Sequence, residues 1–110
     1  MEAGINQYDI FWVKLDPVEG SEMAKTRPCI VISPNEMNNY LRTVTIVPWT
    51  TNLYPVRWRV GVFCDGQTGM AALDHIRSVS KSRLVNRIGS LQISEIVEIK
   101  HVIKEMLVDT

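Results

Sequence analysis

Three short segments of this chain contain polar side chains that could bind a phosphate or transfer a proton. In the first, residues 20–28, Arg27 stands directly before Pro28. A residue before proline is restricted to extended backbone, so Arg27 should lie at a fixed point where a loop enters a strand. Because its guanidinium keeps its charge and offers a planar fork of donors that matches phosphate oxygens, we expect an anion site here. The alternative is an ion-paired surface arginine.

The second segment follows a predicted strand over residues 43–47 that runs into Pro48. Thr50, Thr51 and Asn52 come next, at the expected end of that strand. Hydroxyl and carboxamide groups in such a place can bind a phosphate or the edge of a base. The alternative is that the two threonines only cap a turn.

The third segment, residues 73–83, contains Asp74, His75 and Arg77. If it is a strand, Asp74 lies on one face and the other two side chains lie on the opposite face. His75 is then a candidate proton shuttle, because histidine is the side chain that titrates near neutral pH. The alternative is that Asp74 and Arg77 form a structural ion pair and that His75 is a satisfied polar residue.

Aromatic and basic residues are interleaved in one further stretch. Trp49, Tyr54 and Trp58 lie close to Arg57 and Arg59 in the sequence. Such a mixture suits single-stranded nucleic acid, whose bases stack on aromatic rings and whose phosphates pair with cations. The alternative is that both tryptophans belong to the hydrophobic core.

The sequence contains no nucleophile elbow, phosphate-binding loop or Walker lysine. Cys29, Cys64, His75 and His101 stand at no spacing that is typical of metal ligands. We therefore expect buried thiols inside strands, no cofactor and no dedicated metal site, while a magnesium ion held by carboxylates stays an open alternative.

Short strands and one helix must position these side chains. Apolar runs bounded by turn residues predict strands over 10–15, 29–32, 43–47, 56–63, 70–73 and 76–79, a loop over 18–26 and a turn over 65–69. A C-terminal helix capped by Ser94 is predicted by an apolar stripe at helical spacing, namely Ile96, Ile99, Ile103, Met106 and Leu107. Strands joined by short turns favour a mainly β, antiparallel, barrel-like fold with the helix packed across it.

The chain has 110 residues, of which 45% are hydrophobic and 22% are charged, as in globular proteins. This length predicts one domain over residues 1–110. No apolar run approaches the roughly 20 residues that span a bilayer, and the N-terminus lacks a signal-peptide pattern. We therefore expect a cytoplasmic protein with no membrane partner.

The formal net charge is zero, with 12 basic and 12 acidic residues, which at first argues against a nucleic-acid binder. The charge is uneven, however. Residues 25–87 carry nine basic and three acidic side chains, hence +6, whereas residues 1–24 carry −4 and residues 88–110 carry −2. Since a phosphate responds mainly to charges within a Debye length, about 8 Å in physiological salt, the zero net charge does not exclude nucleic acid as a partner of the basic central segment.

Taken together, these segments resemble the MazF/PemK family of toxin endoribonucleases, in the family's order from about Tyr8 to Leu107. Each motif is weak alone, but the ordered set is specific. It comprises Asp9-Ile10-Phe11-Trp12-Val13, Asp16-Pro17, Gly20-Ser21-Glu22, Arg27-Pro28, Val31-Ile32-Ser33-Pro34, Asn38, Val47-Pro48-Trp49-Thr50-Thr51, Asp74-His75-Ile76-Arg77-Ser78-Val79 and Lys81-Ser82-Arg83-Leu84.

The resemblance implies an SH3-like barrel of about five to seven strands with a C-terminal helix, assembled as a homodimer. It implies metal-independent cleavage of single-stranded RNA at a short sequence, which inhibits translation and growth. It also implies a cognate antitoxin whose disordered tail blocks the RNA groove. The family's catalytic arginine and threonine fall on Arg27 and Thr50, and some members also implicate Glu22 and Asp74.

The same resemblance selects the residues that we expect to contact RNA. They are Lys25, Trp49, Thr51, Asn52, Arg57, Asp74, His75 and Arg77. Many members have glutamine at the position of His75 and a smaller residue at that of Trp49, so the cleaved sequence is left open, but the chemistry is not. The general base is a separate open choice among Glu22, Asp74 and His75, ranked in that order.

Two other functions on this fold are alternatives. Related toxins that poison DNA gyrase end in Trp-Gly-Ile, whereas this chain ends in residues 107–110, Leu-Val-Asp-Thr, which disfavours that function. A catalytically silent SH3-like binding module is disfavoured because Arg27, Thr50 and Glu22 are all present.

Overall fold

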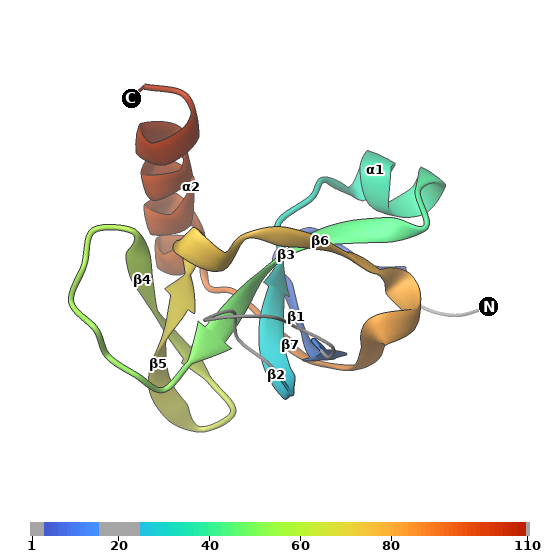
Figure 1. The fold of residues 1–110 in the computed structure, drawn as a ribbon, viewed down its shortest axis with the longest axis horizontal. Coiled ribbons are helices and arrows are strands. Elements are labelled where there is room, and N and C mark those ends of the chain that lie inside the picture. The colour runs from blue at the N-terminus through green and yellow to red at the C-terminus, as the bar shows by residue number, and fades with distance from the viewer. Residues whose placement is uncertain (1–3, 16–24, 110) are drawn as a thin grey trace.

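Strands dominate the structure, a computed structural model that describes residues 4–15 and 25–109. Within these residues, seven strands form one curled antiparallel sheet, and the C-terminal helix packs against one end of it (Figure 1). The predicted mainly β architecture is confirmed. The elements are β1 (Asp9–Lys14), β2 (Thr26–Val31), α1 (Asn35–Tyr40), β3 (Thr43–Thr50), β4 (Arg59–Cys64), β5 (Gln67–Ala72), the 3₁₀ turn η1 (Leu73–His75), β6 (Arg77–Ser80), the 3₁₀ turn η2 (Lys81–Arg83), β7 (Leu84–Ser90) and α2 (Ile93–Leu107).

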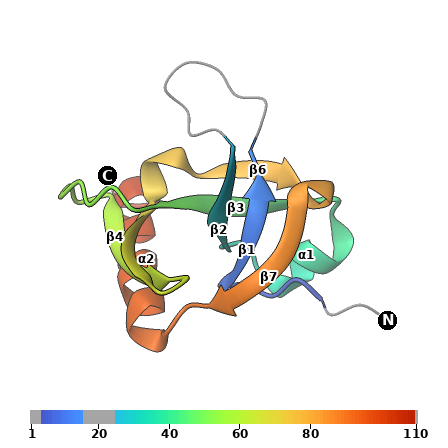
Figure 2. The same ribbon diagram turned by 90° about the horizontal axis from the view of Figure 1, so that it is seen from below.

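The longest strand, β3, connects the two parts of the sheet. The strand order is β4-β5-β3-β2-β1-β7, and β6 also pairs with β3; Figure 2 shows β7, β1 and β2 side by side with β3 crossing behind them. The prediction that this strand ends at Pro48 is wrong, because it continues to Thr50. On one side, β3 pairs with β6 through residues 43–46 and with β5 through Trp49 and Thr50. Pro48 lies between these two pairings, where the N–H that proline lacks is not needed for the hydrogen-bond ladder.

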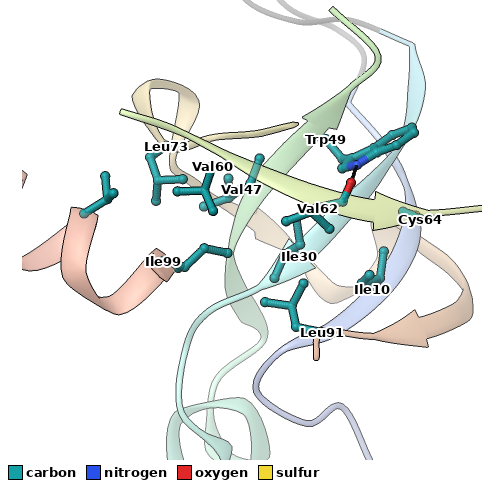
Figure 3. Packing of buried hydrophobic residues seen from close by; sticks show 12 residues of the cluster. Ile10, Ile30, Val47, Trp49, Val60, Val62, Cys64, Leu73, Leu91 and Ile99 are labelled. Carbon is teal, nitrogen blue, oxygen red and sulfur yellow. Dashed lines mark hydrogen bonds between the residues drawn. The ribbon is translucent and has the colours of Figure 1, made fainter. Parts of the chain in front are cut away.

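Hydrophobic clusters lie on both faces of β2. Ile30 belongs to the cluster that also contains Ile99 of α2 (Figure 3), whereas Cys29 and Val31 belong to the other cluster. Burial on both faces explains why this strand appears in the sequence as a continuous apolar run and not as an alternating one. Cys29 and Cys64 are buried free thiols inside strands, as predicted.

The N-terminus of α2 is fastened by a reciprocal pair of hydrogen bonds. Gln92, and not the predicted Ser94, is the N-cap, and the Oε1 atom of Glu95 accepts its backbone N–H at 2.8 Å. The prediction failed because serine is the commoner cap, whereas here the Gln92–Glu95 capping box satisfies the free amides. The Oε2 atom of Glu95 accepts the N–H of Phe63 at 2.9 Å, which ties the helix to the edge strand β4.

The predicted apolar stripe of α2 is correct except at its end. Ile99 is fully buried, but Leu107 is 59% exposed, and Val102, which was not predicted, is buried in its place. Two elements, α1 and β7, were not predicted from the sequence.

Neither helix in the described part of the chain is long and apolar enough to cross a bilayer.

The hairpin between β4 and β5 is tighter than predicted. Asp65 and Gly66 both have positive φ, 54° and 75°, as a two-residue hairpin turn with this Asp-Gly sequence requires. Strand β5 therefore starts at Gln67 and occupies most of the predicted turn, and β4 starts at Arg59, later than predicted.

A buried amide links α1 to the rest of the fold and provides a test of this packing. Asn38 accepts the Ser33 hydroxyl at 2.6 Å and donates to the carbonyls of Ser33 and Ile5 at 2.9 and 3.3 Å. We expect Asn38→Ala to lower the free energy of unfolding in urea by about 1–3 kcal/mol, because buried polar groups lose their partners. Asn39→Ala, at an exposed position, is the control and should change it by less than about 0.5 kcal/mol. Equal values for the two variants would contradict this role for Asn38.

Candidate active site

The start of β2 and the end of β3 lie side by side, because the two strands are antiparallel with Cys29 opposite Pro48. A cavity of about 170 Å³ opens at this place. Its lining residues are Lys25, Thr26, Arg27, Pro28, Trp49, Thr50 and Thr51. The first and second polar segments predicted from the sequence therefore meet in one cavity.

Arg27 lies within β2, where its backbone is extended as the following Pro28 requires, and its side chain is half-buried. Just before it, Lys25 has a φ of 68°, a left-handed conformation that lysine rarely adopts. The carbonyl of Lys25 accepts the N–H of Leu15 at 2.9 Å, which holds this bend against the end of β1. Backbone strain of this kind is concentrated at functional sites, and here it lies at the rim of the cavity.

Thr50 combines a structural contact with a place in the cavity. It is 7% exposed, and its Oγ1 atom accepts the backbone N–H of Asn52 at 3.1 Å. The hydroxyl therefore caps a turn, as the alternative interpretation held. Because a threonine hydroxyl still has one proton to donate, it can also donate a hydrogen bond to an anion in the cavity.

Two arginines place positive charge around the buried part of β2. Burial raises the pKa of Cys29 to about 12, against the charges of Arg27 and Arg77, which both act to lower it. Arg77 of β6 therefore lies near the same stretch of β2 as Arg27, although it is not among the residues that line the cavity. The Cys29 thiol, which donates to the Arg27 carbonyl at 3.6 Å, stays protonated at neutral pH.

Asp74 belongs to a second polar cluster. Arg59 donates two hydrogen bonds to its carboxylate, each of 3.0 Å, and Nε2 of His75 lies 3.5 Å from it. Burial raises the pKa of Asp74, but hydrogen bonds from Arg59 and its own backbone N–H, with the nearby Arg59 and His75 charges, outweigh burial and lower it. The alternative interpretation, an ion pair of Asp74 with Arg77, is wrong in its partner, because residues 73–75 form η1 in place of a strand and Asp74 pairs with Arg59 of β4. The sequence placed Arg59 in the basic and aromatic stretch but gave no signal that it pairs with Asp74.

The aromatic residues of that stretch divide between core and surface. Trp49 is 5% exposed and its indole N–H donates to the Val62 carbonyl at 2.8 Å, so the core interpretation holds for it. Tyr54 and Trp58 are exposed. Arg57 does not line the cavity that contains Arg27. It lines a separate cavity of about 260 Å³ together with Trp58, Val102, Glu105 and Met106.

A family model described as a PemK-like, MazF-like toxin of type II toxin–antitoxin systems matches residues 6–107. The chain belongs to this toxin family. The endoribonuclease toxin MazF of Escherichia coli K12 is 32% identical over 93 residues, which cover 84% of each chain. The chain is thus a MazF-like toxin with endoribonuclease activity.

Solved structures of MazF proteins share the fold of this MazF-like toxin. The crystal structure of MazF from Deinococcus radiodurans matches with a TM-score of 0.85 at 21% identity, over 96% of this chain and 98% of that one. A MazE–MazF crystal structure from the same organism matches with a TM-score of 0.79 at 18% identity, over 97% and 98%.

Of the residues predicted for this MazF-like toxin, Glu22 lies outside the described residues, together with the rest of its Gly-Ser-Glu motif. Five of the others line the Arg27 cavity, and Asn52 adjoins it through Thr50. In the described parts of the chain, no group of three or more histidine, cysteine, aspartate or glutamate side chains is placed to hold a metal ion.

The Asp74–Arg59 pair should give the toxin a stability term that depends on pH. A carboxyl group whose pKa is lowered by folding stabilises the fold above its ordinary pKa, 3.8, and loses this effect as the pH falls through the folded value. Asp74→Asn should therefore lower Tm at pH 7, by no more than the equivalent of about 1 kcal/mol because the carboxylate is partly exposed. Thermal unfolding followed by circular dichroism between pH 7 and pH 3 should show the difference shrinking below about pH 4.

The control for this variant is Glu98→Gln, at an exposed position of α2, whose Tm should follow the wild type at every pH. An Asp74→Asn difference that stays constant down to pH 3 would contradict the ionic origin of the effect.

Proposed function

We propose that this toxin cleaves single-stranded RNA, including messenger RNA, at one short recurring sequence, without a metal ion. The 2′-hydroxyl attacks the adjacent phosphate, and the products are a 2′,3′-cyclic phosphate and a 5′-hydroxyl end. The observation that carries this proposal is the single cavity in which β2 and β3 bring Arg27 and Thr50 together. Cleavage of messages stops translation and growth, which is the effect expected of a toxin.

The chemistry requires little beyond positioning and charge. RNA supplies its own nucleophile, so the protein must hold the nucleotide in line, move protons and stabilise the extra negative charge on phosphorus. Arg27 suits the last task and can donate an N–H hydrogen bond to the leaving 5′-oxygen, which takes up a proton from solvent as its bond to phosphorus breaks. A guanidinium that keeps its charge is a poor base. Thr50 donates a hydrogen bond to a non-bridging phosphate oxygen.

The proton acceptor for the 2′-hydroxyl is proposed from three side chains, Glu22, Asp74 and His75. Asp74 already accepts two hydrogen bonds from Arg59 and has a lowered pKa, which makes its carboxylate a weak base, so we rank it last. Glu22 is ranked first as the proton acceptor because it belongs to the Gly-Ser-Glu motif of the family. His75 is second, because the carboxylate of Asp74, 3.5 Å from its Nε2 atom, can orient the ring.

The remaining contacts with RNA follow from where positive charge lies. Lys25, Thr51 and Asn52 surround the catalytic cavity and bind the phosphates on either side of the cut. Because Glu22 has the first rank as the base, we assign His75, with Arg57 and Arg77, to nucleotides farther along the strand. The charge of +6 on residues 25–87 supports this assignment, because it attracts a polyanion locally although the whole chain is neutral.

We further propose that the toxin is one domain over residues 1–110, forms a homodimer, and acts in the cytoplasm, where its RNA substrates are. A cognate antitoxin would inhibit it by laying a disordered tail across the RNA groove. The MazE–MazF crystal structure with the same fold supports a partner of this kind.

Replacing the arginine tests the proposed chemistry. Arg27→Ala should lower the initial rate of RNA cleavage in EDTA by about 10³-fold or more, because the charge that stabilises the transition state is lost. The rate is measured on an end-labelled single-stranded RNA, and circular dichroism should show an unchanged fold. Arg42→Ala, which removes the same charge at an exposed position before β3, should cut at the wild-type rate. Full activity of Arg27→Ala, or a strict requirement for added metal, would overturn the mechanism.

The threonine provides a smaller and separate effect. Thr50→Val keeps the shape of the side chain but removes the donor, so kcat should fall by about 10²-fold with little change in KM. Thr68→Val, at an exposed position of β5, is the matched control and should keep the wild-type kcat. A change in KM alone would assign Thr50 to substrate binding and not to the transition state.

A further inference from the structure

The side chain of Trp49 spans three strands. From β3, where Trp49 lies opposite Ala71 of β5, the indole reaches to β4, and its N–H donates to the Val62 carbonyl at 2.8 Å (Figure 3). The residue is 5% exposed. If the ring swung away, both the indole donor and the carbonyl would lose their partner, so the hydrogen bond selects one orientation of the ring.

A glycine on the intervening strand makes room for this ring. Gly69 of β5 lies opposite Val62, and a Cβ atom added to it would stand 2.3 Å from Cζ2 and 2.4 Å from Cε2 of Trp49. The same Cβ would stand 2.7 Å from the carbonyl oxygen of Thr50. The absence of a side chain at Gly69 is therefore what lets the indole cross β5, and it couples this glycine to the backbone of the catalytic threonine.

Trp49 is also one of the residues that line the cavity with Arg27 and Thr50. A buried ring held by a hydrogen bond to Val62 resists moving aside when a nucleotide enters. Because it is buried, it also offers no open face on which a base could stack. Its effect on a substrate is therefore steric, as part of the wall of the cavity of about 170 Å³.

We infer that Trp49 determines specificity: its locked indole forms the wall that decides which nucleotide is accepted beside the scissile phosphate. This inference rests on the proposed function of the cavity. A fixed wall discriminates most strongly against groups that are too large, because the side chains of a close-packed protein interior shift little to make room. A smaller side chain at this position would admit a larger base at one place in the recognised sequence and leave the other places unchanged.

The test is to map the 5′-hydroxyl ends that the full-length protein produces from a mixed single-stranded RNA pool. Trp49→Ala should relax base preference about tenfold or more at the single nucleotide position next to the cut. Trp49→Phe, which keeps an aromatic ring but loses the N–H, should relax the same position less. Val60→Ala, a core change in β4 that lines no part of this cavity, controls for lost stability and should keep the wild-type sequence preference.

The contact with Gly69 gives a second measurement that a general loss of stability would not reproduce. Gly69→Ala pushes on the indole, so it should alter preference at the same nucleotide position as Trp49→Phe. In the double variant the smaller phenyl ring relieves the clash with the indole but not the one with the Thr50 carbonyl oxygen, 2.7 Å from the added Cβ atom. The two changes in base preference at this nucleotide position should therefore be clearly less than additive, whereas a loss of cleavage rate caused by the Thr50 contact should remain.

The possible outcomes separate this inference from the proposed function. An unchanged preference in Trp49→Phe and Gly69→Ala, or equal relaxation at every position, would overturn the role of Trp49 while wild-type cleavage still supports the proposed function. If Trp49→Ala does not fold, Trp49→Phe and Gly69→Ala decide the question. A wild-type protein that cuts no RNA in EDTA would instead overturn the proposed function, and the inference with it.

Discussion

The antiparallel pairing of β2 with β3 sets the positions of the cavity and of the two hydrophobic clusters. It places the first residues of β2 beside the last residues of β3, because Cys29 lies opposite Pro48. Burial on both faces fixes this register: a slip of one residue would remove Ile30 from one hydrophobic cluster and Cys29 from the other. The same register therefore places Arg27 and Thr50 in one cavity at the ends of these strands. Fixed placement suits a reaction whose nucleophile comes from the substrate and whose catalyst must chiefly hold and neutralise it.

Local chemistry made part of this site predictable from the sequence. Arg27 before Pro28 indicated a fixed guanidinium, and the apolar runs indicated the strands that carry it. The features that failed depend on neighbours distant in the sequence. Pro48 looks like a strand end, but β3 exchanges one partner for another there. Asp74 pairs with Arg59 because a 3₁₀ turn, which no short pattern predicts, replaces a strand. Gly69 resembled a turn residue, and only the indole that crosses it explains its place.

Local charge and local burial, and not averages over the chain, decide which residues of this protein can bind an anion or react. Its net charge of zero hides a central segment of +6, and the arginines of that segment have different tasks. Arg59 donates two hydrogen bonds to Asp74, whereas Arg27 lines the cavity. Burial in turn keeps both thiols protonated, since it raises the pKa of Cys29 to about 12 and that of Cys64 to about 11. The cysteines therefore serve packing, and the chemistry is left to arginine, threonine and a base.

In the proposed reaction, the RNA attacks itself within the cavity that Arg27 and Thr50 share. Two synthetic RNAs that contain the mapped cleavage sequence test this, one all-ribose and one with a single 2′-deoxyribose on the 5′ side of the cut. In EDTA, we expect the all-ribose strand to be cut to a 2′,3′-cyclic phosphate and a 5′-hydroxyl, and the deoxy-substituted strand to stay intact at that bond. Cleavage of both strands at the same bond and rate would contradict it.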